Sequence, residues 1–130
     1  MEELEAKIKS IIEYDARYGP GAYELVLNAV EHAVAALGKP RHLAAREVLD
    51  SVRALGLEKF GAFRGEVFSE WAVASAADVG NIVYNLISGG LLLADEKDNP
   101  SDFNIEYDLV GDGRREDGLE PPASGVTKID

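Results

Sequence analysis

The sequence predicts a mainly α protein with a small C-terminal β-hairpin. Three observations lead to this fold class. Apolar residues recur at helical spacing over most of residues 2–88, clusters of glycine and proline separate the periodic stretches, and a strict apolar–polar alternation begins only at Phe103. We expect residues 1–110 to form a single domain and residues 111–130, which offer little to bury, to form a disordered tail.

The N-terminal half predicts three helices. An amphipathic helix over 2–17 ends at a Gly-Pro-Gly sequence, and a second helix over 21–37 is apolar on most sides, which is typical of a helix at the centre of a core. Gly38 and Pro40 end the second helix, and a third follows over 42–58.

The next stretch predicts two more helices and a hairpin. In the short helix "EVFSEWA", we expect Phe68 and Trp71 to fill the core against the third helix. Ser75 is then a candidate N-cap with Asp78 three residues on, and the helix that it starts ends at a glycine pair. "LLLAD" and "FNIEYDLV" predict two strands joined by a turn. This order predicts a winged-helix-like C-terminal half preceded by two N-terminal helices.

Composition narrows the classes of function. The chain has no cysteine, which excludes a disulfide framework, a thiolate zinc site and a thiol nucleophile. We expect no signal peptide, and no apolar run is long enough to cross a membrane, so we expect a cytoplasmic protein without membrane contact. Of the net charge of −11, residues 65–113 carry −9, with ten acidic residues and one basic residue.

The helix that would read DNA in a winged helix has a polar stripe of Asp78, Asn81, Asn85 and Ser88, which we expect to face solvent. Asparagine can read adenine in the major groove. However, affinity for DNA comes mainly from lysine and arginine on phosphates, and residues 65–96 contain neither. The sequence therefore favours a solvated or protein-binding face over a DNA-reading one.

Acidic residues gather in the predicted hairpin, at Asp95, Glu96, Asp98 and Asp102. Their carboxylates are suitable calcium ligands, but their spacing does not match a calcium-binding loop, and such a charge run more often forms a solvated face. We expect no metal and no cofactor, and we predict these four as partner-binding residues.

Basic residues gather before and along the third helix, where Lys39 precedes the predicted partner-binding residues Arg41, His42, Arg46 and Arg53. One interpretation is an anion or acidic-partner site at a helix N-terminus. The other, which we favour, is that these bases balance the acidic half within one chain or between two.

The two histidines receive different interpretations. His32 lies on an apolar seam, where we expect a buried structural histidine, and His42 is the only plausible catalytic base. No nucleophile motif or phosphate-binding loop accompanies His42, so the sequence does not favour an enzyme.

Several stretches together resemble the Minf-type family of small uncharacterised bacterial proteins. They are "AYELVLNAVEHAVAALGKPRHLAAREVLDSVRALGLEKFG", "EWAVASAADVGNIVYNLISGGLL" and "DNPSDFNIEYDL", within residues 10–110. The resemblance implies an ordered domain and brings no activity or catalytic residue with it. Within the resemblance, Arg41 and His42 are the positions of most interest, because packing explains an exposed pair less well than it explains the other matching residues.

The leading hypothesis is a non-catalytic protein–protein interaction module with an acidic winged-helix-like surface, which binds a partner protein or itself, with a homodimer left open. One alternative is a nucleic-acid-associated regulator that contacts phosphates through basic residues between Lys39 and Arg64. A second alternative is an enzyme that uses His42.

Overall fold

The computed structural model describes residues 2–39, 41–94 and 99–111. Within these ranges the chain forms five α-helices and two short 3₁₀ helices, so the mainly α fold class is confirmed. The α-helices are α1 (Glu2–Tyr14), α2 (Pro20–Leu37), α3 (Ala45–Phe60), α4 (Arg64–Glu70) and α5 (Ala76–Ser88), and the 3₁₀ helices are η1 (Gly61–Phe63) and η2 (Pro100–Phe103).

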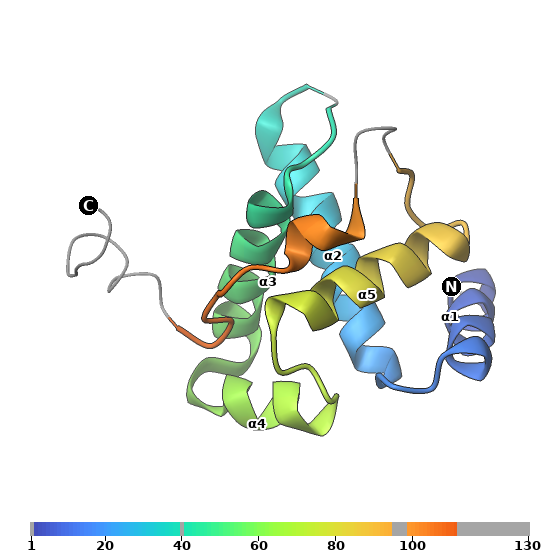
Figure 1. The fold of residues 1–130 in the computed structure, drawn as a ribbon, viewed down its shortest axis with the longest axis horizontal. Coiled ribbons are helices and arrows are strands. Elements are labelled where there is room, and N and C mark those ends of the chain that lie inside the picture. The colour runs from blue at the N-terminus through green and yellow to red at the C-terminus, as the bar shows by residue number, and fades with distance from the viewer. Residues whose placement is uncertain (1, 40, 95–98, 112–130) are drawn as a thin grey trace.

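Helix α2 is at the centre of the molecule. Figure 1 shows α3 beside α2, α5 crossing in front of α2, and α1 at the side away from α3. The N-terminal part of α2 supplies six buried residues, namely Ala22, Tyr23, Leu25, Val26, Leu27 and Ala29. From Val30 onward α2 is half-buried or exposed, although it remains mostly apolar. The sequence therefore correctly predicts a central helix, but its C-terminal part extends beyond the core.

Two helix ends have the chemistry that the sequence predicts. Gly38 ends α2 in the left-handed conformation with φ 76°, which a residue with a side chain rarely adopts. Ser75 caps α5: its hydroxyl accepts from the Asp78 N–H at 3.4 Å, and the Asp78 carboxylate accepts from the Ser75 N–H at 3.1 Å. The predicted capping box is confirmed.

Large side chains fill spaces that only glycine leaves open. Phe68 is buried and its ring lies against Gly56, where an added Cβ would be 2.8 Å from the ring, and Trp71 lies against Gly21. Trp71 also stacks on Phe68, with ring centroids 6.2 Å apart. The prediction that these two aromatic residues fill the core beside the third helix is confirmed, and Trp71 additionally covers the start of α2.

The predicted C-terminal hairpin is wrong for the described residues, because neither expected strand forms there. After α5, the N–H groups of Leu91 and Leu92 both donate to the Leu86 carbonyl, at 2.9 and 3.3 Å, so the chain folds back on the helix end. The expected turn at residues 95–98 lies outside the described residues, as does 112–130, most of the predicted tail. Without the hairpin, the helix order alone does not make the C-terminal half a winged helix.

A short 3₁₀ helix replaces the start of the second strand. Asn99 caps it by accepting from the Ser101 N–H at 2.9 Å, Pro100 occupies its first turn, and the Asp102 carboxylate accepts from the Asn99 N–H. Phe103 then lies against α5, where a Cβ added at Gly80 would be 2.6 Å from Phe103 Cβ. A local helix-start signal therefore outweighs the alternation that predicted a strand.

The chain continues across α3 without pairing to another strand. The Tyr107 ring contacts two guanidinium groups: its centroid is 5.3 Å from Arg46 Cζ and 4.8 Å from Arg53 Cζ, and its hydroxyl donates to Asp50. Leu109 is buried. Residues 99–110, which we call the C-terminal segment, therefore cover α3 and α5 with side chains rather than with a sheet (Figure 1).

Candidate functional site

The segment between α1 and α2 covers the polar stripe of α5 that the sequence places in solvent. The Tyr18 hydroxyl donates to Asp78 Oδ1 at 2.7 Å and accepts from Asn81 Nδ2 at 2.9 Å. Of the predicted stripe, Ser88 is exposed. The expectation that Asp78 and Asn81 face solvent is wrong, because the tyrosine supplies them with polar partners inside the molecule.

Asn85 makes the same kind of contact one helical turn later. Its amide donates to Asp15 Oδ2 at 2.9 Å and to the Tyr23 hydroxyl at 3.0 Å. Arg17 forms a two-pronged ion pair with Asp15, at 2.7 Å for its shortest contact. This pair first, and the Asn85 amide second, hold the pKa of Asp15 well below its ordinary value. We call this set the α5 junction: Asp15, Tyr18, Tyr23, Asp78, Asn81 and Asn85.

The pKa of Asp78 is lowered by a balance of opposing effects. Burial raises the pKa of this carboxyl, and it is the largest single effect. Hydrogen bonds from Tyr18, the Ala74 and Ser75 backbone N–H groups and the Ser75 hydroxyl together outweigh burial. The junction is therefore built around an ionised Asp78, which holds α5 to the N-terminal helices.

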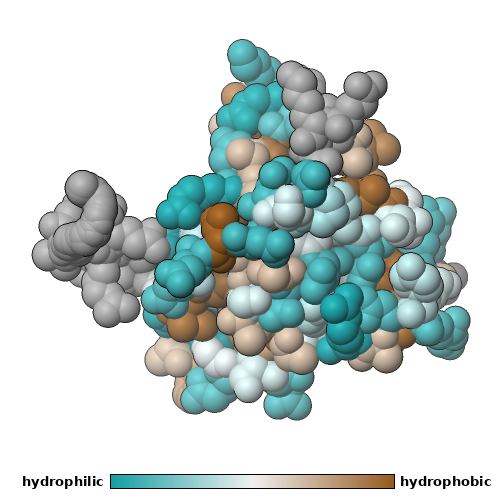
Figure 2. All heavy atoms as spheres, in the orientation of Figure 1, coloured by the Kyte–Doolittle hydropathy of each residue, from teal (hydrophilic) through white to brown (hydrophobic). Residues whose placement is uncertain are grey.

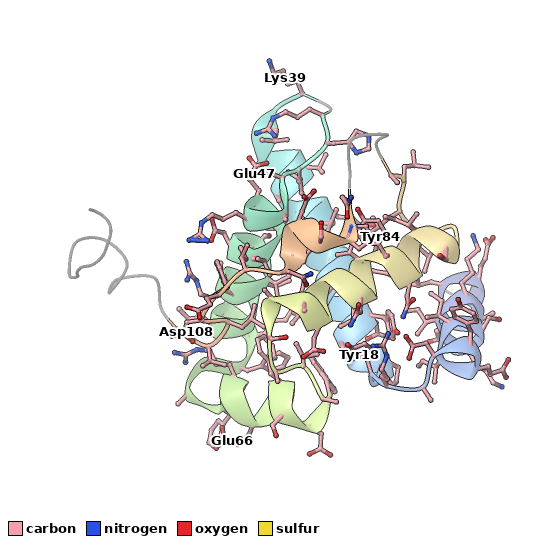
Figure 3. All side chains as sticks on the ribbon, in the orientation of Figure 1. Tyr18, Lys39, Glu47, Glu66, Tyr84 and Asp108 are labelled. Carbon is pink, nitrogen blue, oxygen red and sulfur yellow. The ribbon has the colours of Figure 1, made fainter. Side chains whose placement is uncertain are left out.

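The basic residues of the predicted partner site are engaged within the chain. Arg41 forms a two-pronged ion pair with Glu47, at 3.0 and 2.8 Å, and donates to its neighbour's carbonyl. Arg46 and Arg53 lie against Tyr107, and Arg53 also pairs with Asp50 at 3.5 Å. Figure 3 shows Glu47 near the start of α3 and Lys39 at the tip of the preceding loop. These contacts engage the bases within the chain, but Glu47 and Asp50 lie outside the acidic half at residues 65–113, so the ion pairs do not balance that half.

The structure contradicts the expected position of one of the two histidines. His32 is exposed, so the expected buried structural histidine is wrong; it follows the part of α2 that the core encloses. His42 is exposed and lies at the edge of a surface groove.

Of the predicted acidic partner-binding residues, the described part of the chain includes one. Asp102 is exposed and accepts from the Asn99 N–H within the cap of η2. Asp95, Glu96 and Asp98 lie outside the described residues. In the described ranges no group of three or more histidine or carboxylate side chains is placed to hold a metal ion.

The groove that His42 borders has a volume of about 840 Å³. The C-terminal part of α2, the chain from Arg41 to Ala45, and the chain from α5 to Leu93 line it, and η2 contributes Asp102 and Phe103. Most of the lining is aliphatic: Val30, Val34, Leu43, Val48, Val83, Ile87, Leu91, Leu92 and Leu93. Figure 2 shows apolar atoms at the surface at this upper end of the molecule. Figure 3 marks Tyr84, whose half-buried side chain also lines the groove.

The groove also contains apolar residues that are not part of the core cluster, among them Val34 and Leu93. Leu93 is 87% exposed, and the C-terminal part of α2 is only partly covered. Sequence reasoning brings Arg41, His42 and Asp102 to notice, and the structure gathers these three around one groove. It misses Val34, Tyr84 and Leu93, for which the surplus of apolar residues in α2 and the "LLL" after α5 are the available signals.

A second, smaller groove of about 630 Å³ lies between α1 and the C-terminal end of α5. Its lining mixes apolar and polar groups, among them Lys7, Ser10, Tyr14, Asn85 and Ser88. Asn85 belongs to the α5 junction, so one wall of this groove already has a structural role.

Over the ranges that the structure describes, none of the helices has the length and apolar character needed to cross a membrane. A comparison with protein-family models, curated proteins and solved structures finds no match to this chain.

Proposed function

We propose that this chain is a non-catalytic protein–protein interaction module and that it binds its partner in the groove formed by α2, α5 and the chain between α2 and α3. The observation that supports this proposal most directly is the groove's aliphatic lining, which continues from the core out to the exposed side chain of Leu93. Exposed apolar surface bordered by polar groups is typical of a binding surface.

The resemblance to the Minf-type family forms part of the same proposal, because Arg41 and His42 border this groove. The contacts that Arg41, Arg46 and Arg53 make within the chain support a structural role for these bases. The alternatives of a nucleic-acid-associated regulator and of an enzyme that uses His42 stay predictions.

A photo-crosslinking experiment tests the proposal in cells that express the protein naturally. A benzophenone amino acid replaces Leu93, which is 87% exposed at the groove, or Phe63, which is 70% exposed and does not line it. We expect a discrete crosslinked partner from position 93 and none from position 63.

A matched pair of variants then assigns the crosslink to the groove. Ala35 and Ala36 are adjacent exposed residues of α2, and only Ala35 lines the groove. We expect Ala35→Trp to fill the groove and abolish the crosslink, and Ala36→Trp to leave it unchanged. Equal crosslinking from positions 93 and 63, or a crosslink that survives Ala35→Trp, would contradict the proposal.

A further inference from the structure

The charges around the groove are not equally compensated. Arg41 is neutralised by its two-pronged pair with Glu47. Glu31 and Asp102 also line the groove and are exposed, and neither forms an ion pair with another described residue. As far as the described residues show, the groove therefore offers a partner two carboxylates without an ion-pair partner, beside an aliphatic surface.

The described chain after Arg64, which supplies the α5 and η2 wall of the groove, carries charge of the same sign as these carboxylates. Residues 65–94 and 99–111 contain no lysine or arginine, and their acidic residues are Glu66, Glu70, Asp78, Asp102, Glu106 and Asp108. A negative field of this kind attracts basic partners and opposes acidic ones, which makes basic residues in the partner the complementary choice.

The secondary structure and the lining of the groove limit which conformations of a partner peptide can bind there. An extended peptide that adds a strand needs a free sheet edge, and the described residues form no sheet. Proline-rich peptides dock in aromatic-lined grooves, whereas this lining is mainly aliphatic. The recognition mode that suits an aliphatic groove is an amphipathic helix whose apolar face enters it.

Building on the proposed function, we infer that the groove binds a short amphipathic helix of a partner protein. The apolar side chains of that helix occupy the space between Val34, Ile87 and Leu92, and its lysine or arginine side chains pair with Glu31 and Asp102.

Synthetic peptides test this inference with defined probes. The first is a labelled peptide of about 15 residues, long enough to form a helix, with leucine at positions i, i+3, i+4 and i+7 of one face and lysine beside that face. The second replaces every lysine with glutamate, and the third has the lysine and leucine composition of the first with the leucines spread around the helix. Fluorescence anisotropy gives the affinities, and amide chemical shifts of the full chain give the location.

We expect the lysine peptide to bind in the groove about tenfold more tightly than the glutamate peptide and the rearranged peptide. The preference for lysine should shrink as salt is added. Ala35→Trp should abolish binding, and Ala36→Trp should not.

Two double variants isolate the role of the carboxylates. Glu31→Gln with Asp102→Asn removes both negative charges of the groove lining, and Glu24→Gln with Glu66→Gln removes two exposed negative charges outside it. We expect the first pair to reduce the preference for lysine to less than about threefold and the second pair to preserve it.

Different failures have different meanings. Equal or tighter groove binding of the glutamate peptide overturns the charge assignment and leaves the interaction function standing. Binding of dodecanoate but of none of the peptides, blocked by Ala35→Trp, overturns both in favour of a small-ligand pocket. Self-association that Ala35→Trp abolishes, measured by sedimentation, assigns the groove to a second copy and overturns the inference.

Discussion

At the scale of single residues, Asp78 has two roles that the structure joins. Its carboxylate completes the cap of α5, and the same group accepts a hydrogen bond from Tyr18, which belongs to the segment between α1 and α2. One side chain therefore fixes both the start of a helix and the position of that helix against its neighbours.

This double role predicts a specific dependence on pH. The pKa of Asp78 is lower in the folded protein than its ordinary value of 3.8, so the ionised carboxylate contributes stability above about pH 4, and the contribution is lost as the pH falls through the folded pKa. We expect Asp78→Asn to reduce the free energy of unfolding by about 1 kcal/mol at pH 7, because hydrogen bonds to the carboxylate are weakened. The difference from the unaltered protein should shrink at pH 3 and below.

Urea unfolding at pH 7, 4 and 2.5 measures both effects. Glu24→Gln is the control, because it removes the same charge from an exposed position of α2. A loss for Asp78→Asn that is equally large at pH 7 and pH 2.5 would argue against an ionised carboxylate at the junction.

The sequence predicts the cap at Ser75 and Asp78 but not the direction of the stripe that includes Asn81 and Asn85. A cap depends on residues three positions apart, which a sequence shows directly. Asn81 and Asn85 bind Tyr18 and Tyr23, which are more than 60 positions away in the sequence. Without knowledge of these partners, polar residues opposite an apolar stripe are predicted to face water. Hydropathy alone does not distinguish water from a tyrosine hydroxyl as the partner.

At the scale of elements, glycines set how closely the helices and the C-terminal segment approach one another. Gly80 of α5 admits Phe103, and Gly89 just after α5 admits Ile11 of α1, where an added Cβ would lie 2.7 Å from Ile11 Cδ1. These positions hold α5 between an N-terminal helix and the C-terminal segment.

The Gly80 contact predicts opposite outcomes for two glycine substitutions. Alanine normally favours a helix over glycine by up to about 1 kcal/mol. At Gly80 the new methyl group would meet Phe103 Cβ at 2.6 Å, and a Cβ atom cannot rotate away, so we expect a net destabilisation of about 1–2 kcal/mol. At Gly65 of α4 the nearest atom is 4.0 Å away, so Gly65→Ala should be neutral or stabilising by up to about 1 kcal/mol.

Denaturant unfolding of the two variants provides the measurement. Chemical shifts of Asp102 and Phe103 should move in Gly80→Ala and stay unchanged in Gly65→Ala. The idea of a close contact fails if Gly80→Ala is as stable as Gly65→Ala.

An element can be predicted from the sequence when the interactions that form it join residues close together in the chain. Helices α1 to α5 lie close to their predicted positions because their apolar periodicity is local. The apolar–polar alternation from Phe103 does place alternate side chains inward. The predicted hairpin is nevertheless wrong, because these side chains contact helices: Phe103 contacts α5, and Tyr107 contacts α3. The signal that would have corrected it is Asn99-Pro100 with Asp102, a helix start within the expected hairpin.

At the scale of the whole molecule, several arginine side chains make their contacts within the chain. Arg64 donates to the Val110 carbonyl at 2.7 Å and to the Gly61 carbonyl at 2.6 Å, while the guanidinium groups of Arg46 and Arg53 both contact the Tyr107 ring. These three arginines are therefore engaged within the chain, and the net charge of the whole protein is −11.

This arrangement predicts weak interaction with nucleic acid. We expect no gel shift of a 30-base-pair duplex of about micromolar concentration, even at low salt, because phosphates would be repelled by the net charge. The control is a variant with Arg46→Ala and Arg53→Ala, which should behave in the same way. Binding that weakens steeply with salt and is lost in this variant would instead support the regulator hypothesis.

The α5 junction also has a consequence for how the chain folds as it is made. Tyr18 and Asp78 are 60 positions apart and Asp15 and Asn85 are 70 apart, so the N-terminal residues are synthesised well before their partners. At roughly 5–20 residues per second, the delay is about 3–14 s. During that time the hydroxyl of Tyr18 has water as its partner, and Ile11 lacks the cover of α5. Translation thus opens an interval of seconds in which α1 and α2 present apolar surface to chaperones or to other nascent chains.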